Sequence, residues 1–255
     1  MIWTCLYDNM GPLFLPWFTI IIVLLSEFAN IPFIIFDIKK MFPKNRIHYS
    51  KKYDRPYPTH KDIMDGIHAL IMSYKKVLLP IMICGFLFLH ITGLQFYVIT
   101  RELPNWWEYT RDMILLSILG DVLFYVIHRV FHIPYLYKRF HKQHHYYNLT
   151  FSLVNHYVHP FELAIFVIPA ALPPILLNVH LYHMWHWAFW ANVHGIYTHS
   201  GYIFPISKLS WFPIFHSEEH DAHHYVFTKN YGAIFNFMDK LCGTYYKADI
   251  TYFDI

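Results

Sequence analysis

The sequence predicts an all-α membrane protein with about four transmembrane helices. Of its 255 residues, 56% are hydrophobic and only 15% are charged, whereas an ordinary soluble domain carries about 25% charged residues. Several nearly uncharged runs reach the roughly 20 residues that a helix needs to cross a bilayer. No composition change marks a flexible junction, so we expect one structural unit, with N-terminal membrane helices in residues 1–110 and a second region in residues 111–255.

The first two predicted spans flank a basic segment. Residues 12–36 carry Glu27 as their single charge, and residues 77–100 form the second apolar run. Between them, residues 37–76 hold ten of the twenty lysines and arginines, which places this connector in the cytosol by the positive-inside tendency. We expect a solvated loop that contacts lipid headgroups, although the same charges also suit an acidic redox partner.

The later apolar runs bring the chain back to the same side. Residues 113–131 form the third predicted span, and residues 161–179 and 181–197 form a fourth run broken by a pair of prolines. We expect a helical hairpin there that either crosses the membrane or dips into it, because proline interrupts a helix. From residue 199 onward the chain is mixed and aromatic-rich, which is typical of a cytosolic cap over the membrane helices.

Histidines are the most informative residues. The chain has 20 of them, and eight form three clusters: His128 and His132; His141, His144 and His145; His220, His223 and His224. Helix positions i, i+3 and i+4 share one face, so each cluster directs its imidazoles to a common point. Two histidines on their own usually lie on an ordinary helix surface. Eight imidazole nitrogens, however, exceed the ligand set of one zinc ion and suit two iron ions. We therefore expect the cap to hold a di-metal site.

The clusters read HRVFH, HKQHH and HDAHH, and they resemble, in order and type, the three histidine boxes of the membrane sterol desaturase and fatty acid hydroxylase superfamily. The resemblance extends from about residue 120 to residue 244. It includes HPFE from His159, HSGYIFP from His199, NYG from Asn230 and DKLCGT from Asp239. The pattern is most similar to the C-4 methylsterol oxidase and cholesterol 25-hydroxylase branches. It departs from them at the two glutamates before the third box, where relatives often carry another histidine.

The resemblance implies a di-iron oxygenase of the endoplasmic reticulum membrane, multi-pass, with its histidine clusters facing the cytosol. It would use two Fe ions and O2, and would receive electrons through cytochrome b5 or an NAD(P)H-dependent reductase. The implied reaction hydroxylates or oxidises a C–H bond of a lipid, first of all a sterol. A sphingolipid or fatty acid hydroxylase and a sterol desaturase remain alternatives, and residues 111–255 would be the catalytic region.

Two other classes of membrane protein compete with an oxygenase. A haem-binding electron carrier predicts lone histidines in mid-membrane, and a metal-ion transporter predicts several intramembrane carboxylates. Neither pattern fits clustered histidines beside charged residues. The net charge of +3 is too small to indicate a nucleic acid partner.

Four residues outside the boxes are further candidates. The resemblance suggests His199 as a ninth ligand, although a packing or supporting role is open, and His159 as a residue that either lines the site or anchors a helix. Asp121 lies seven residues before His128. A carboxylate in an apolar run is energetically unfavourable unless it is paired. We expect it to accept the outer N–H of a ligand histidine, with a structural hydrogen bond to a neighbouring helix as the alternative. Glu162 invites the same two interpretations.

We expect the other histidines to have structural roles, and no side chain to be catalytic beyond the metal centre. His180, His183 and His186 are regularly spaced but drift around a helix, so packing or interfacial roles are expected for them. His156 is isolated and is treated in the same way.

Overall fold

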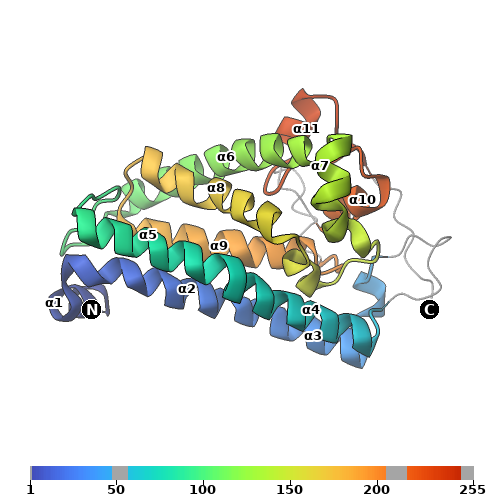
Figure 1. The fold of residues 1–255 in the computed structure, drawn as a ribbon, viewed down its shortest axis with the longest axis horizontal. Helices are drawn as coiled ribbons and strands as arrows, with labels where there is room; N and C mark the ends of the chain where they lie inside the picture. Colours follow the sequence, from blue (N-terminus) through green and yellow to red (C-terminus); the bar gives the residue numbers. More distant parts are fainter. Residues whose placement is uncertain (1, 48–56, 205–216, 248–255) are drawn as a thin grey trace.

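The computed structural model describes residues 2–47, 57–204 and 217–247, and within these ranges the fold is helical with no strand, only isolated bridges (Figure 1). The predicted all-α class is confirmed. The helices are α1 (Ile2–Phe14), α2 (Phe18–Ser26), α3 (Asn30–Lys39), α4 (His60–Ser73), α5 (Leu79–Thr92), α6 (Trp106–Phe131), α7 (Pro134–Arg139), α8 (Pro160–Leu176), α9 (Leu181–Thr198), α10 (Ser217–Val226) and α11 (Phe237–Leu241).

Three helical stretches are long and apolar enough to cross a membrane: Leu15–Lys39, His60–Thr92 and Trp106–Phe131. The first joins α2 to α3 through a short 3-10 turn, and the second joins α4 to α5 through the π turn Tyr74–Leu78. A shorter apolar helix, α8, corresponds to part of the fourth predicted run. The three long stretches follow the order of the first three predicted spans, and the fourth predicted run is represented by the shorter helix α8.

We expected a polar loop over residues 37–76, and this prediction is wrong after residue 59, where the chain is helical. Helix α4 begins at His60 because Thr59 and Asp62 form a capping box, in which each side chain bonds the backbone N–H of the other. The continuous stretch His60–Thr92 has 33 residues and is therefore about 50 Å long, well beyond the roughly 30 Å of a bilayer core. The α4 end, which carries most of the charges, must project past the hydrocarbon.

Helix α9 lies at the centre of the bundle, packed against α2, α6 and α8 (Figure 1). Close approach of α6 and α9 depends on Gly120, because a Cβ atom there would lie 2.6 Å from the ring of Trp187. Helices α7, α10 and α11 gather at the end of the bundle where α6 finishes, and the chain reversals after α5 and α8 lie at the opposite end. The three histidine clusters therefore fall at a single end of the molecule.

Candidate metal centre

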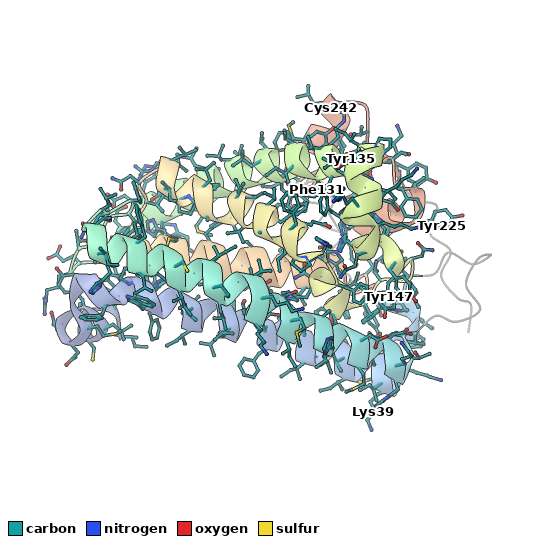
Figure 2. All side chains as sticks on the ribbon, viewed as in Figure 1. Lys39, Phe131, Tyr135, Tyr147, Tyr225 and Cys242 are labelled. Carbon is teal, nitrogen blue, oxygen red and sulfur yellow. The ribbon has the colours of Figure 1, made fainter. Side chains whose placement is uncertain are left out.

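Nine histidines meet at the α7 and α10 end of the bundle. They come from the end of α6, from the 3-10 turn His141–Tyr146, from the residue that ends α9, and from α10. Phe131 at the end of α6 and Tyr225 on α10, both labelled in Figure 2, mark this region. All nine are the histidines that the sequence proposes as ligands, so residues as far apart in the chain as His128 and His224 converge here.

The nine side chains divide into two groups, each of which could hold a metal ion. Within each group, one ring nitrogen per residue lies within 4.8 Å of all the others. The five-histidine group is His128, His132, His141, His145 and His223; the four-histidine group is His144, His199, His220 and His224. The groups are neighbours, since the rings of His141 and His144 have centroids 5.4 Å apart.

The sequence spacing explains this division. Residues four apart stay together, as in the pairs His128 and His132 or His220 and His224, because they lie on the same side of a helical turn. The remaining member of each three-histidine box, His144 or His223, is directed to the other group. The second and third boxes thus each contribute to both groups.

The separations between ring nitrogens match those of ligands around a single ion. In the five-histidine group, the Nε2 atom of His141 lies 2.9 Å from that of His132 and 3.0 Å from that of His145. In the four-histidine group, the Nε2 atom of His199 lies 3.2 Å from that of His144 and 2.8 Å from that of His220. Imidazole nitrogens about 2.0–2.1 Å from a zinc-sized ion stand about 2.9–3.4 Å apart for angles between octahedral and tetrahedral. The spacing therefore fits a metal shell.

Burial keeps these imidazoles neutral. It lowers the pKa of His199 to about 3, and burial together with neighbouring histidines lowers the pKa of His141 and His223 well below the ordinary value. The same cause lowers the pKa of four more histidines: His144, His145, His220 and His224. Neutral rings keep a lone pair on the inward nitrogen, which is the form that binds a metal.

The outer nitrogens fix which atom faces inward. The Nδ1 atoms of His128, His199 and His223 donate to the backbone carbonyls of Tyr231 (2.9 Å), Gly195 (2.7 Å) and Lys229 (2.6 Å) respectively. Because a carbonyl only accepts, each Nδ1 carries the hydrogen and each Nε2 is left with its lone pair. Such outer bonds orient metal-binding histidines.

The ring of His224 gives an independent test of whether a metal fits. Both of its nitrogens are buried, and neither has a hydrogen-bond partner among the residues that the structure describes. An imidazole buried in this way costs free energy unless something absent from the protein chain binds it. Two borderline divalent ions fit this nitrogen-only set, and sulfur ligands play no part.

Glu162, in the first turn of α8, supports the five-histidine group. Its Oε1 atom accepts from Nδ1 of His141 at 2.6 Å, and both side chains are about 1% exposed. Proline at the start of α8 and the side chain of His159, which accepts from the Phe161 N–H, fix this turn. His159 itself is half-buried and lies in neither group.

We expect Glu162→Ala to weaken metal binding by about 10- to 100-fold, because His141 loses the acceptor that orients it. Chelator competition on the purified protein would measure the change. Glu162→Gln should recover part of the affinity, since the amide oxygen still accepts. Glu108→Ala removes an exposed capping residue at the far end of α6, and it should leave the metal affinity unchanged. Equal affinity in Glu162→Ala and the unaltered protein would contradict this role.

Asp121 does not make the contact that we expected. Its Oδ1 atom accepts three backbone N–H groups, from Ala233 (3.0 Å), Ile234 (2.7 Å) and Phe235 (3.2 Å). Seven residues are about 10.5 Å along a helix, so Asp121 lies too far from the His128 ring to bond it. It instead anchors the segment after α10, whose Tyr231 carbonyl holds His128.

Arg46 belongs to the surroundings of the site, although no pattern in the sequence indicates this role. The fully buried guanidinium pairs with Asp37 at 3.5 Å and donates to the carbonyls of Ser200 (2.5 Å) and Thr150 (2.8 Å). The Thr150 hydroxyl donates in turn to Asp221, inside the third box. The only sequence feature that pointed to a nearby partner was Asp221 in the third box, because an aspartate between buried histidines requires one.

Two histidines outside the groups also have carboxylate partners. His183 donates from Nδ1 to Asp112 at 2.8 Å, a buried structural contact remote from the clusters. His156 is bonded through Nε2 to Glu27 at 3.1 Å. Glu27 could have been suspected of a role from the sequence, because a lone carboxylate inside an apolar span is costly unless paired.

The family comparison agrees with this architecture. The sequence model of the fatty acid hydroxylase family matches residues 113–244, which is more than half of the chain. The chain belongs to this family, within the sterol desaturase and fatty acid hydroxylase superfamily. The protein is accordingly a membrane oxygenase of the fatty acid hydroxylase family.

Among curated relatives, very-long-chain aldehyde decarbonylase GL1-11 of Oryza sativa subsp. indica is 31% identical over 89% of this chain and 85% of its own length. Methylsterol monooxygenase 2-2 of Arabidopsis thaliana is 29% identical, covering 85% of this chain and 79% of that protein. A putative methylsterol monooxygenase of Dictyostelium discoideum is 31% identical over 86% of this chain and 79% of its own length. No solved structure matches the chain.

Proposed function

We propose that the protein is a non-haem di-iron monooxygenase that oxidises a C–H bond of a membrane lipid, and that the lipid is a sterol. The observation that carries the proposal is the pair of adjacent groups of neutral, buried imidazoles. Two iron ions would be held by His128, His132, His141, His145 and His223, and by His144, His199, His220 and His224. Methylsterol monooxygenases among the relatives favour a sterol.

The chain supplies geometry and dryness rather than acid–base chemistry. Bound iron would supply the activation of dioxygen and the cleavage of an unactivated C–H bond, which no side chain can perform. The histidines would hold the ions from several elements. Glu162 would keep the ring of His141 oriented, and backbone carbonyls would do the same for His128, His199 and His223. Eight of the nine histidines are buried, which excludes bulk water from the site.

The distribution of charge supports a cytosolic orientation of the metal centre. Lys39 at the end of α3 is labelled in Figure 2 and lies at the same end of the molecule as Tyr225 of α10. Lys138 and Arg139 of α7 are at that end as well. Because positive residues favour the cytosolic face, we propose an endoplasmic reticulum membrane protein that receives electrons from cytochrome b5 or an NAD(P)H-dependent reductase on that face.

A very-long-chain aldehyde is the second candidate substrate. It is favoured by the rice decarbonylase, which is 31% identical over 89% of this chain. Sphingolipid or fatty acid hydroxylation and sterol desaturation begin with the same hydrogen abstraction, so the metal centre alone does not separate these reactions.

Lipid analysis of cells tests the proposal. The chain and its His144→Ala variant are expressed in parallel, and sterols, sphingolipids and long-chain aldehydes are compared by mass spectrometry. A 4-carboxy or side-chain-hydroxy sterol that depends on His144 is the expected result. Loss of long-chain aldehydes with unchanged sterols would select the second candidate. Identical lipids in both cell lines, with both proteins expressed and folded, would reject an oxygenase.

A further inference from the structure

The segment between α10 and α11 holds two of the candidate ligand histidines through its main chain. The carbonyl of Tyr231 accepts from Nδ1 of His128 at 2.9 Å, and the carbonyl of Lys229 accepts from Nδ1 of His223 at 2.6 Å. Both histidines belong to the five-histidine group. A change in the accepting strength of either carbonyl therefore acts on the ligands of a single candidate ion.

The peptide group that holds His128 is bonded to a carboxylate on its other side. The Tyr231 carbonyl and the Gly232 N–H belong to the same peptide group, and this N–H donates to Oδ2 of Asp239 at 2.8 Å. Because a peptide group is conjugated, a negative charge that accepts its N–H increases the electron density on its carbonyl oxygen. Asp239 is thereby connected to Nδ1 of His128 through one amide plane.

Asp239 is a buried end point for this chain of hydrogen bonds. It is 0% exposed, and its Oδ1 atom accepts from the Tyr231 N–H at 2.9 Å and from the Thr244 hydroxyl at 2.8 Å. The same hydroxyl lies 2.9 Å from that of Tyr125. A carboxylate accepts on both oxygens and a backbone N–H only donates, so the partners of Asp239 match it in type. Hydrogen bonds to an ionised group are roughly twice as strong as neutral ones.

The other two carbonyls that orient ligand rings have neutral partners. The Lys229 carbonyl shares its peptide group with the Asn230 N–H, which donates to the carbonyl of Thr244 at 2.9 Å. In the four-histidine group, His199 donates to the carbonyl of Gly195. The N–H of that peptide group lies inside α9, where helix geometry directs it to the carbonyl four residues earlier. Both of these chains of hydrogen bonds therefore end at uncharged groups.

We propose that Asp239 is a positioning residue for the ion of the five-histidine group, and that it acts on His128 through the peptide between Tyr231 and Gly232. The polarised carbonyl holds the His128 ring in its orientation and makes the inward nitrogen a stronger donor to a metal. The NYG and DKLCGT elements of the sequence supply this peptide and this carboxylate. The inference rests on the proposed function, since it takes the histidine clusters as metal ligands.

Chelator competition with Zn²⁺ on the purified full chain tests which group Asp239 serves. His144→Ala impairs the four-histidine group and retains the other, whereas His223→Ala impairs the five-histidine group. In the His144→Ala background, Asp239→Asn should lower the Zn²⁺ affinity by about 10- to 100-fold, as the loss of a group that orients a ligand does. In the His223→Ala background it should leave the affinity unchanged. A similar loss in both backgrounds, or no loss in the first, would overturn the proposal.

The route through the peptide is measured by NMR of the Zn²⁺-loaded chain with ¹⁵N-labelled histidine. Asp239→Asn should move the Nδ1 proton of His128 upfield, because its acceptor is no longer polarised by a charge. The Nδ1 proton of His223 should move much less, since its chain of hydrogen bonds ends at a carbonyl. A lowered affinity with an unmoved His128 proton would contradict the proposal, because Asp239 would then act only on the fold.

Asp121→Asn separates polarisation of the carbonyl from anchoring of the segment. Asp121 is equally buried and accepts the N–H groups of residues 233–235, so it holds the same segment without bonding the peptide that orients His128. This variant should change the His128 proton and the Zn²⁺ affinity less than Asp239→Asn does. Equal effects of the two variants would show that anchoring alone is responsible and would reject the role of the charge.

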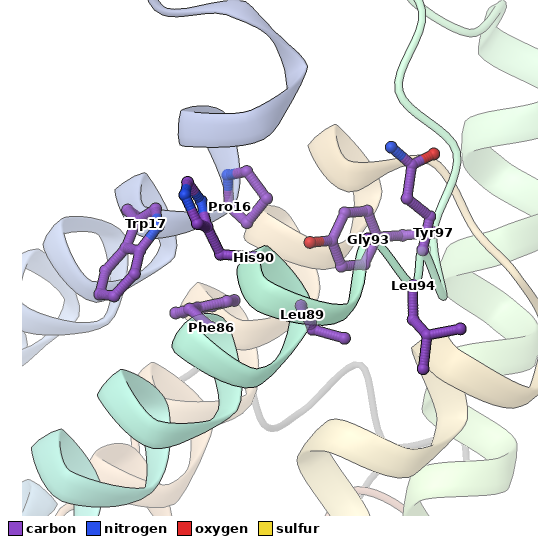
Figure 3. A pocket seen from close by; sticks show the side chains of 9 residues that line it. Pro16, Trp17, Phe86, Leu89, His90, Gly93, Leu94 and Tyr97 are labelled. Atoms are coloured by element: carbon purple, nitrogen blue, oxygen red, sulfur yellow. The ribbon is translucent and has the colours of Figure 1, made fainter.

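His90 provides an internal reference in the same spectra. It lies near the end of α5, opposite the histidine clusters, and lines a separate cavity of about 40 Å³ beside Trp17 and Tyr97 (Figure 3). Its ring-nitrogen signals should be the same in every variant, and a shift there as large as that of His128 would overturn the proposal.

Iron content and lipid oxidation of the unaltered protein distinguish this inference from the proposed function. Zn²⁺ binding and NMR shifts that follow these expectations, in a chain that oxidises no lipid, would reject the proposed function alone. An active iron protein in which Asp239→Asn has no selective effect would reject the inference alone. A chain that binds neither Zn²⁺ nor iron would reject both.

Discussion

Replacing His223 by alanine should abolish lipid oxidation and remove at least half of the bound iron. His223 comes from the third box but belongs to the five-histidine group, where its Nε2 lies 3.2 Å from that of His145. Removing one inward nitrogen leaves an incomplete shell for one ion, and the affinity for that ion falls steeply. His144→Ala should have the same effect on the four-histidine group. Elemental analysis and product formation in purified protein measure both consequences.

The matched control for both variants is His183→Ala. His183 is equally buried, but it pairs with Asp112 away from the clusters, so iron content and product formation should stay close to those of the unaltered protein. A fully active His223→Ala protein would contradict the assignment of ligands. Complete loss of iron in His183→Ala would show that the histidines have been ranked wrongly.

Replacing Arg46 by methionine should lower the free energy of unfolding by about 3–5 kcal/mol, because removal of one partner leaves a buried carboxylate without its counter-ion. Arg46 is 0% exposed and joins Asp37 of α3 to the backbone at Ser200 and Thr150. The change therefore separates the first membrane span from the segment that carries His199. Thermal or denaturant unfolding in detergent measures the loss.

Arg101→Met provides the comparison for Arg46. Arg101 also pairs with an aspartate, Asp8, but both side chains are largely exposed, and exposed pairs contribute little. This variant should have the same free energy of unfolding as the unaltered protein. An Arg46→Met protein as stable as the unaltered protein would show that the buried ion pair has no structural role. It would also contradict the proposal that Arg46 links α3 to the metal centre.

Much of the fold could be predicted because the bilayer restricts what an apolar run can do. A run as apolar as residues 113–131, whose only charged residues are Asp121 and Arg129, has almost no alternative to a helix, and α6 contains it. The start of α4 was missed because its signal is a local capping box rather than an apolar run. Lysines and arginines near residue 60 concealed a helix that projects beyond the lipid.

The candidate site was predictable as a set of residues but not as an arrangement. Spacing of four residues is a local property, and it explains why His128 and His132 share a group. The placement of Asp121 against the backbone of Ala233 is a long-range contact across 112 residues that no local pattern encodes. The same holds for His156, whose partner Glu27 lies 129 residues earlier.

The turn His141–Tyr146 gives two of its histidines to one group and one to the other. Both ions would thus share a single six-residue tether, and ordering that tether for the first ion prepares it for the second. Assembly of such a centre would then be cooperative, and by reciprocity each ion would raise the affinity for the other by the same factor. Cells short of iron would then contain mostly empty and fully loaded protein, with few half-loaded molecules.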